Sequence, residues 1–291
     1  MTHLRDFLFG PFIDFAFMRQ ALVACLALAL GAGPVGVFLI LRRMSLVGDA
    51  MSHAVLPGAA IGFVIAGLSL VAMGIGGLIA GLLVALLSGL ISRYTALRED
   101  ASFAAFYLMS LALGVLIVST HGSNVDLIHV LFGTILAVDK AALIVIATVT
   151  SLTILCFAVI YRPLVMECFD PGFLRAAGRW GAICHGIFLV MLVANLVTGF
   201  QALGTLMSVG LMMLPAAAAK FWARDVWSLM LTAAAIALAS AYCGLLISYH
   251  AGIASGPAII LVAGGTYLVS LLFGRADSLR SRYLRSAHLT A

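Results

Sequence analysis

Apolar runs of about 20 residues recur along nearly the whole chain, and each is long enough for a helix to cross the hydrocarbon core of a bilayer. Backbone groups in lipid need internal hydrogen-bond partners, and the alternating pattern of a transmembrane β-barrel is absent. The spans are therefore predicted to be helical. Nine are predicted: 18–41, 46–67, 70–92, 101–120, 139–160, 181–199, 203–219, 226–248 and 257–273.

The composition agrees with an integral membrane protein. Hydrophobic residues make up 64% of the chain and charged residues 9%, with a mean hydropathy of +1.20, whereas about a quarter of a soluble protein is charged. The net charge of +5 is not gathered into a basic cluster with interleaved aromatic residues, so no nucleic-acid partner is expected. Connections are short, which predicts one all-α domain over residues 1–291, surrounded by membrane lipid, with eight or nine transmembrane helices.

The positions of Lys and Arg predict the orientation, because positive charge is retained on the cytoplasmic side of short loops. If the first span ends in the cytoplasm, only Arg5, Arg19 and Lys140 of the 16 basic residues lie outside. The N-terminus is therefore expected outside, and the basic tail at 275–291 inside, in the cytoplasmic (inner) membrane of a bacterium.

Two ionisable residues, Asp49 and His53, lie inside the second apolar segment. Four residues apart on a helix, they share one face, and His53 lies about 15 Å beyond Arg43, near the middle of a bilayer core. Ionisable groups at that depth are costly and usually belong to a transport pathway. Imidazole nitrogen and carboxylate oxygen suit zinc, manganese or iron(II). The alternative is a packing pair, with Asp49 bonded to a nearby serine and His53 to a backbone carbonyl.

Other polar positions give weaker signals. His121, Asp126 and His129 could form an outer vestibule for a cation, although aqueous loops commonly contain such residues.

A cytoplasmic loop is predicted over 161–180, after Tyr161-Arg162-Pro163 ends the fifth span. Within it, N-cap, first-turn and C-terminal residue types predict a short helix. Its residues are Asp170, Pro171, Gly172, Phe173, Leu174, Arg175, Ala176, Ala177 and Gly178.

A weak internal sequence repeat relates the second and seventh segments. Residues 54–60 and 212–218 share a Leu-Pro-small-Ala arrangement in spans predicted to run in opposite directions, which is typical of an inverted repeat. Each proline frees a backbone carbonyl, so a broken helix lining a cavity is expected.

No Gly-rich phosphate loop ending in Lys-Ser or Lys-Thr is present, so any ATP hydrolysis is expected on another chain.

The segment Leu41–Gly58 closely resembles the signature of the manganese/zinc/iron permease family of bacterial ABC importers. Further blocks with this resemblance are 131–137, 170–178, 207–219 and 255–257. The resemblance implies a type II importer-like permease in a homodimer or heterodimer, two cytoplasmic ATPase subunits and an extracytoplasmic metal-binding protein. It also implies that Asp49 and His53 contact the transported metal and that Asp170–Gly178 is the coupling helix.

The transported metal is the open point of the resemblance. Many relatives carry Asp-Leu-Pro before the Ser-Gly-Pro block, whereas this chain has Gly252-Ile253-Ala254, so a role for that Asp is not inherited. Residues 121–126 resemble zinc importer permeases, which favours zinc first and manganese second, with no permanently bound cofactor. A proton-coupled secondary transporter, with Asp49 and His53 as a proton relay, is the alternative function.

Overall fold

The computed structural model describes residues 2–67, 69–95, 99–121, 138, 140–170, 180–276 and 278–280. These residues contain helices and turns and no β-strand, so the all-α prediction is confirmed. The helices are α1 (Thr2–Asp14), α2 (Ala16–Leu41), α3 (Ser45–Ala54), α4 (Leu56–Ala66), α5 (Leu70–Tyr94), α6 (Glu99–His121), α8 (Lys140–Phe169), α10 (Trp180–Leu203), α11 (Thr205–Ala219), α12 (Val226–Ala251) and α13 (Ser255–Phe273).

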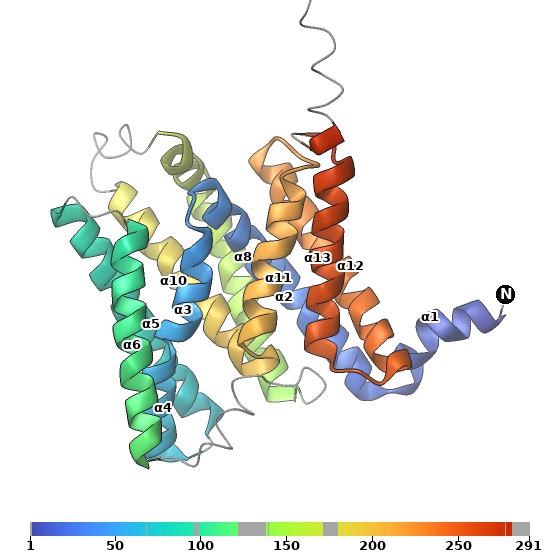
Figure 1. The fold of residues 1–291 in the computed structure, drawn as a ribbon, viewed down its shortest axis with the longest axis horizontal. Helices are drawn as coiled ribbons and strands as arrows, with labels where there is room; N and C mark the ends of the chain where they lie inside the picture. The colour runs from blue at the N-terminus through green and yellow to red at the C-terminus, as the bar shows by residue number, and fades with distance from the viewer. Residues whose placement is uncertain are drawn as a thin grey trace, which may run out of the picture.

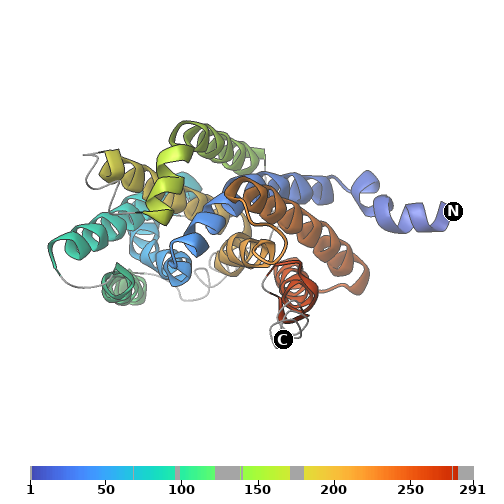
Figure 2. The ribbon, with the colours of Figure 1, turned by 90° about the horizontal axis from the view of Figure 1, so that it is seen from above.

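Each of the nine predicted spans coincides with a helix or, for α3 and α4, with a helix pair. Within the described residues, seven of the spans are long and apolar enough to cross a membrane, and Ala101–Ile117 and Thr205–Ala219 are shorter apolar helices. In Figure 1 these helices run side by side, and successive ones alternate in direction. The bundle is elongated when seen from above, with α1 projecting at one end (Figure 2).

Two features differ from expectation. Helix α8 does not end at Tyr161–Pro163 but continues to Phe169. Pro163 removes one backbone hydrogen bond, but Leu164 is fully buried and Glu167 is ion-paired, and these contacts hold the added turns. The additional helix α1 packs on α12, where the Tyr242 hydroxyl donates a 2.9 Å hydrogen bond to the Leu8 carbonyl.

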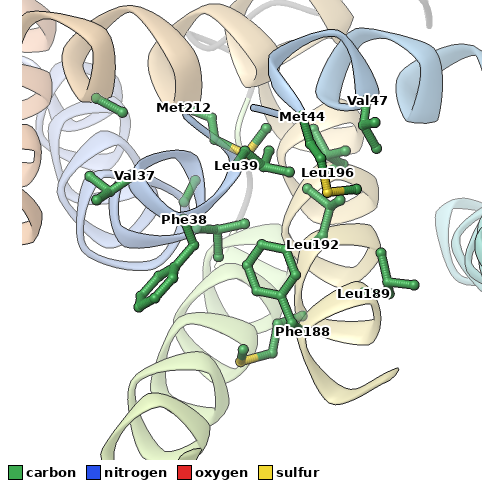
Figure 3. Packing of buried hydrophobic residues seen from close by; sticks show 14 of the residues in the cluster. Val37, Phe38, Leu39, Met44, Val47, Phe188, Leu189, Leu192, Leu196 and Met212 are labelled. Atoms are coloured by element: carbon green, nitrogen blue, oxygen red, sulfur yellow. The ribbon is translucent and has the colours of Figure 1, made fainter. Parts of the chain in front are cut away.

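Two clusters of buried apolar side chains hold the bundle together. The larger is centred on Phe38 of α2, whose ring stacks on Phe157 of α8 at 5.4 Å and meets Phe188 of α10 edge-on at 6.2 Å. Met212 of α11 belongs to the same cluster (Figure 3). The smaller cluster joins α2 to α12 and α13. Helices from distant parts of the chain therefore share one core around α2.

Helices α4 and α5 touch through their backbones. A Cβ atom added at Gly58 would collide with the carbonyl of Gly76, and one added at Gly76 would collide with the carbonyl of Gly58. Close approach through small residues is typical of helix contacts in membranes. This contact fixes α4 against α5 just beyond the polar pair.

Candidate functional site

The second span is interrupted in its middle at a single residue, Val55, whose backbone angles stay helical. Helix α3 ends at Ala54 and α4 begins at Leu56, with Pro57 in its first turn. Because Pro57 has no N–H, the carbonyl of His53 cannot receive the hydrogen bond that a continuous helix would give it. Ser110 of α6 donates a 2.8 Å hydrogen bond to the neighbouring Ala54 carbonyl. The predicted break is therefore found here, whereas α11 continues through Pro215 without one.

Asp49 and His53 lie one turn apart on α3, immediately before the break. The Asp49 side chain is exposed and that of His53 is half-buried. The Nδ1 atom of His53 is buried and has no hydrogen-bond partner among the described residues. Within the described residues, no backbone carbonyl therefore pairs with Nδ1 of His53, which is one of the contacts that the packing alternative allowed. Ser52 donates to the Gly48 carbonyl at 3.2 Å rather than to Asp49.

One face of α6 packs along the second span where α3 meets α4. The Tyr107 ring lies beside His53, with centroids 6.3 Å apart and planes tilted by 31°. One turn on, Ser110 caps the Ala54 carbonyl, and a Cβ atom added at Gly114 would lie 3.3 Å from Cδ of Pro57. These positions share a helix face by their spacing. Tyr107 is a site residue that the sequence did not indicate, because no motif joins it to His53.

The donor set offers one nitrogen and one carboxylate. Among the described residues, no group of three or more His, Cys, Asp or Glu side chains could hold a metal ion. Structural metal sites are closed by four or more ligands. This part of the chain can therefore offer a divalent cation at most two side chains of these four kinds at one place, which suits a partly hydrated ion in passage.

The remaining predicted site residues are only partly described. Residues 122–137, including Asp126 and His129, lie outside the described ranges, and His121 is the last residue of α6. Asp170 is exposed at the end of α8, where its N–H donates to the Met166 carbonyl at 2.8 Å. Residues 171–179 lie outside the described ranges. The coupling-helix assignment therefore stays a prediction.

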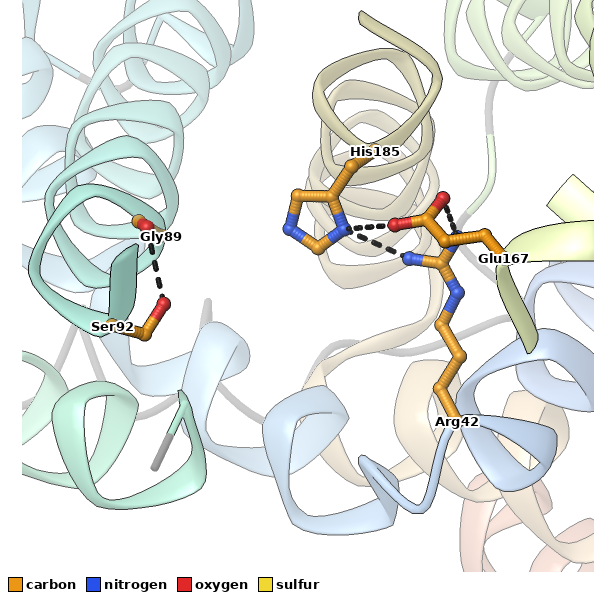
Figure 4. A network of polar contacts seen from close by, with 5 residues as sticks. All are labelled: Arg42, Gly89, Ser92, Glu167 and His185. Carbon is orange, nitrogen blue, oxygen red and sulfur yellow. Dashed lines mark hydrogen bonds and ion pairs between the residues drawn. The ribbon is translucent and has the colours of Figure 1, made fainter. Parts of the chain in front are cut away.

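A second polar cluster was missed entirely from the sequence. Arg42 donates a 2.6 Å hydrogen bond from Nη2 to Oε2 of Glu167, and its Nη1 lies 2.9 Å from Nδ1 of His185 (Figure 4). The same His185 nitrogen lies 3.2 Å from Oε1 of Glu167. The three residues come from three helices. Glu167 is 125 positions from Arg42 in the chain, and His185 is 143 positions from it. Sequence spacing carries no signal for such a contact.

The fold and the site together define a polytopic membrane permease, with a polar pair at a break inside one of its spans. The chain belongs to the ABC 3 transport family, whose family model matches residues 14–274. The resemblance to metal ABC importer permeases noted in the sequence is confirmed by this match.

Curated relatives and a solved structure agree with the family. The chain is 34% identical over 281 residues to the "Manganese import system permease protein ScaB" of Streptococcus parasanguinis, covering 95% of this chain and 99% of that protein. It is 34% identical over 282 residues to the "Manganese transport system membrane protein MntC" of Halalkalibacterium halodurans, covering 96% of this chain and 94% of that protein. The structure of PsaBC from Streptococcus pneumoniae in complex with Fab contains a similar chain, with a TM-score of 0.82 and 32% identity. The match covers 98% of this chain and 100% of that chain.

Proposed function

We propose that this chain is the membrane-spanning subunit of an ATP-driven importer of a divalent transition metal, and that Asp49 and His53 contact the ion. The observation that carries the proposal is the buried Nδ1 atom of His53, which has no partner in the described part of the chain and lies one turn from a carboxylate. An unsatisfied buried polar atom costs free energy unless a ligand or water completes it. A metal ion supplies that missing partner.

The open coordination shell favours transport over storage. Conduction requires that an ion bind well enough to enter and weakly enough to leave. Two protein ligands, with water on the other positions, meet both conditions. Broken helices near the midplane provide such sites in transporters, because their free carbonyls face the cavity.

The partners follow from the proposed role. Two cytoplasmic ATPase subunits would supply the energy and an extracytoplasmic metal-binding protein would deliver the ion. A second copy of this chain would complete the membrane domain, because the α3 face bearing Leu46 and Asp49 is exposed on a single copy. With the N-terminus outside, α3 runs outward, and alternate closure of the two copies would expose the pair to each side in turn.

Manganese(II) is the first metal to test. The relatives named above are manganese permeases, and they do not favour zinc, which residues 121–126 had suggested. Nitrogen and oxygen ligands accept both ions, and zinc is generally bound more tightly by the same donors. Zinc(II) is therefore the competing substrate in every uptake measurement.

The test is uptake of radioactive manganese(II) by vesicles containing this chain with its ATPase subunits. Asp49→Asn and His53→Gln are each expected to reduce uptake by at least about tenfold, because one lost charged or hydrogen-bonded contact costs about 1.5–3 kcal/mol. Matched controls are Asp225→Asn and His250→Gln, which change the same residue types at exposed positions away from α3. Both controls are expected to transport normally.

Normal uptake by both site variants, at normal abundance in the membrane, would contradict the site assignment. The same vesicles test the alternative function. Uptake by this chain alone, driven by a proton gradient and independent of ATP, would favour a secondary transporter.

A further inference from the structure

The cluster of Arg42, Glu167 and His185 joins the ends of three helices. Arg42 is the C-cap residue of α2, Glu167 lies in the last turn of α8 and His185 lies in the second turn of α10. Helices α8 and α10 are the two that flank residues 171–179 in the chain. The contacts therefore tie both sides of that segment to the end of α2.

The three side chains are shielded from solvent. Exposed fractions are 7% for Arg42, 17% for Glu167 and 15% for His185. The guanidinium carbon of Arg42 also lies 4.5 Å from the centre of the Phe188 ring. Removing one member of a buried charged set leaves the others unpaired, so breaking these contacts is costly.

A tight turn links this cluster to the candidate metal site. The Arg43 N–H donates to the Ile40 carbonyl at 3.1 Å, and the Met44 N–H donates to the Leu39 carbonyl at 2.9 Å. Arg43 has a φ of +59°, a left-handed conformation that few residues other than glycine adopt. Helix α3 starts at the next residue but one, Ser45, and carries Asp49 one turn later. A displacement of Arg42 is therefore expected to change the direction of α3.

His185 gives the cluster two possible arrangements. Its Nδ1 atom lies within reach of both the Arg42 guanidinium and the Glu167 carboxylate. An unprotonated Nδ1 accepts a hydrogen bond from arginine, and a protonated one donates to a carboxylate, so one nitrogen cannot serve both partners at once. An element with two discrete arrangements is what physical coupling between distant sites requires.

We infer that Arg42, Glu167 and His185 couple movement at the α8 and α10 ends to the α3 helix that carries Asp49 and His53. This inference rests on the proposed function, together with the sequence-based prediction that Asp170–Gly178 is the coupling helix that docks on an ATPase subunit. The three are positioning residues, because they act on the ion through α3 and do not contact it. A purely structural role would stabilise the fold without setting how much metal moves per ATP.

The test measures metal transported per ATP hydrolysed, in vesicles containing the complete transporter. Arg42→Lys keeps the charge but loses the forked geometry that meets two partners, and Glu167→Gln keeps the size but loses the charge. Each is expected to lower the ratio at least about fivefold, the lower end of common coupling strengths. Abundance, assembly with the ATPase subunits and ATP hydrolysis are expected to stay within about twofold of the parent.

The matched control is Ser270→Ala. It removes the 2.8 Å hydrogen bond that the exposed Trp222 side chain donates to the buried Ser270, a contact that involves neither α8 nor α10. An unchanged metal-to-ATP ratio in both cluster variants overturns the inference, as does an equal fall in Ser270→Ala. If Glu167→Gln does not assemble, Arg42→Lys and His185→Gln decide by the same ratio. A parent complex that moves no divalent metal would contradict the proposed function instead.

Discussion

A buried ring nitrogen without a partner is uncommon in proteins, and His53 carries one beside a break in its own helix. Such a group costs about 1–3 kcal/mol when nothing satisfies it. Under the proposed function, a bound ion or water would occupy the position and offset the cost. His53 is therefore the single residue whose surroundings say most about what the chain does.

The Tyr107 ring is expected to hold the His53 imidazole in place. Tyr107→Ala should raise the KM for manganese(II) uptake two- to about tenfold, because a ring pair contributes about 0.5–1.5 kcal/mol beyond its burial. Tyr107→Phe keeps the ring and should stay near the parent value. Tyr94→Ala is the control, since Tyr94 is 85% exposed. Equal KM values for Tyr107→Ala and the parent would remove Tyr107 from the site.

Single residues differ in how far the sequence can predict them. Asp49 and His53 could be found because two ionisable groups interrupt an otherwise apolar run. Tyr107 could not, since an aromatic residue in a span looks like any core residue. From the sequence, Arg42 is only one of the basic residues that indicate topology, because its partners lie on α8 and α10 and no local pattern points to them.

Among the elements, α4 and α5 should depend on glycine for their contact. Gly76→Ala should lower the free energy of unfolding by about 1–3 kcal/mol, because the added methyl group meets a backbone carbonyl that cannot move aside. Gly89→Ala, on the same helix with nothing within 4 Å, should be neutral or stabilising. The thermal midpoints of the purified variants in detergent measure the difference. A Gly76→Ala variant as stable as Gly89→Ala would contradict the close packing.

Helix boundaries were predictable where hydropathy alone decides them. The segments predicted at 70–92 and 226–248 correspond to α5 and α12 within a few residues. The last two turns of α8 were not predictable, because proline and arginine normally end an apolar helix. Tertiary contacts of Leu164 and Glu167 outweigh that local signal. Helix α1 escaped prediction because its charged and apolar residues are mixed.

At the scale of the whole molecule, the orientation is open to direct measurement. In a background without the five cysteines, Ile253→Cys should react with a membrane-impermeant maleimide added outside intact cells. Arg224→Cys should react only after permeabilisation, because 13 of the 16 basic residues, Arg224 included, lie on the side predicted to be cytoplasmic. Both residues are exposed at helix ends. The reverse labelling pattern would invert the topology and place α3 running inward.

The membrane makes the overall fold predictable, since every span must satisfy its backbone internally. It does not determine which spans touch. The contacts of α2 with α8, α11 and α12 depend on side-chain shape and small residues, which hydropathy does not record. The class of fold therefore follows from composition, and the neighbours around α3 follow only from the three-dimensional structure.

The exposed carboxylate of Asp49 also bears on how the protein accumulates in a cell. A copy inserted alone would turn this group towards hydrocarbon, at a cost of about 2.5–3.5 kcal/mol for a charge at the bilayer centre. In the proposed dimer, pairing with a second copy would remove that cost and shift the equilibrium towards the assembled form by mass action. Unassembled copies would then be less stable in the membrane than assembled ones. The amount of subunit in the membrane would therefore depend on its assembly.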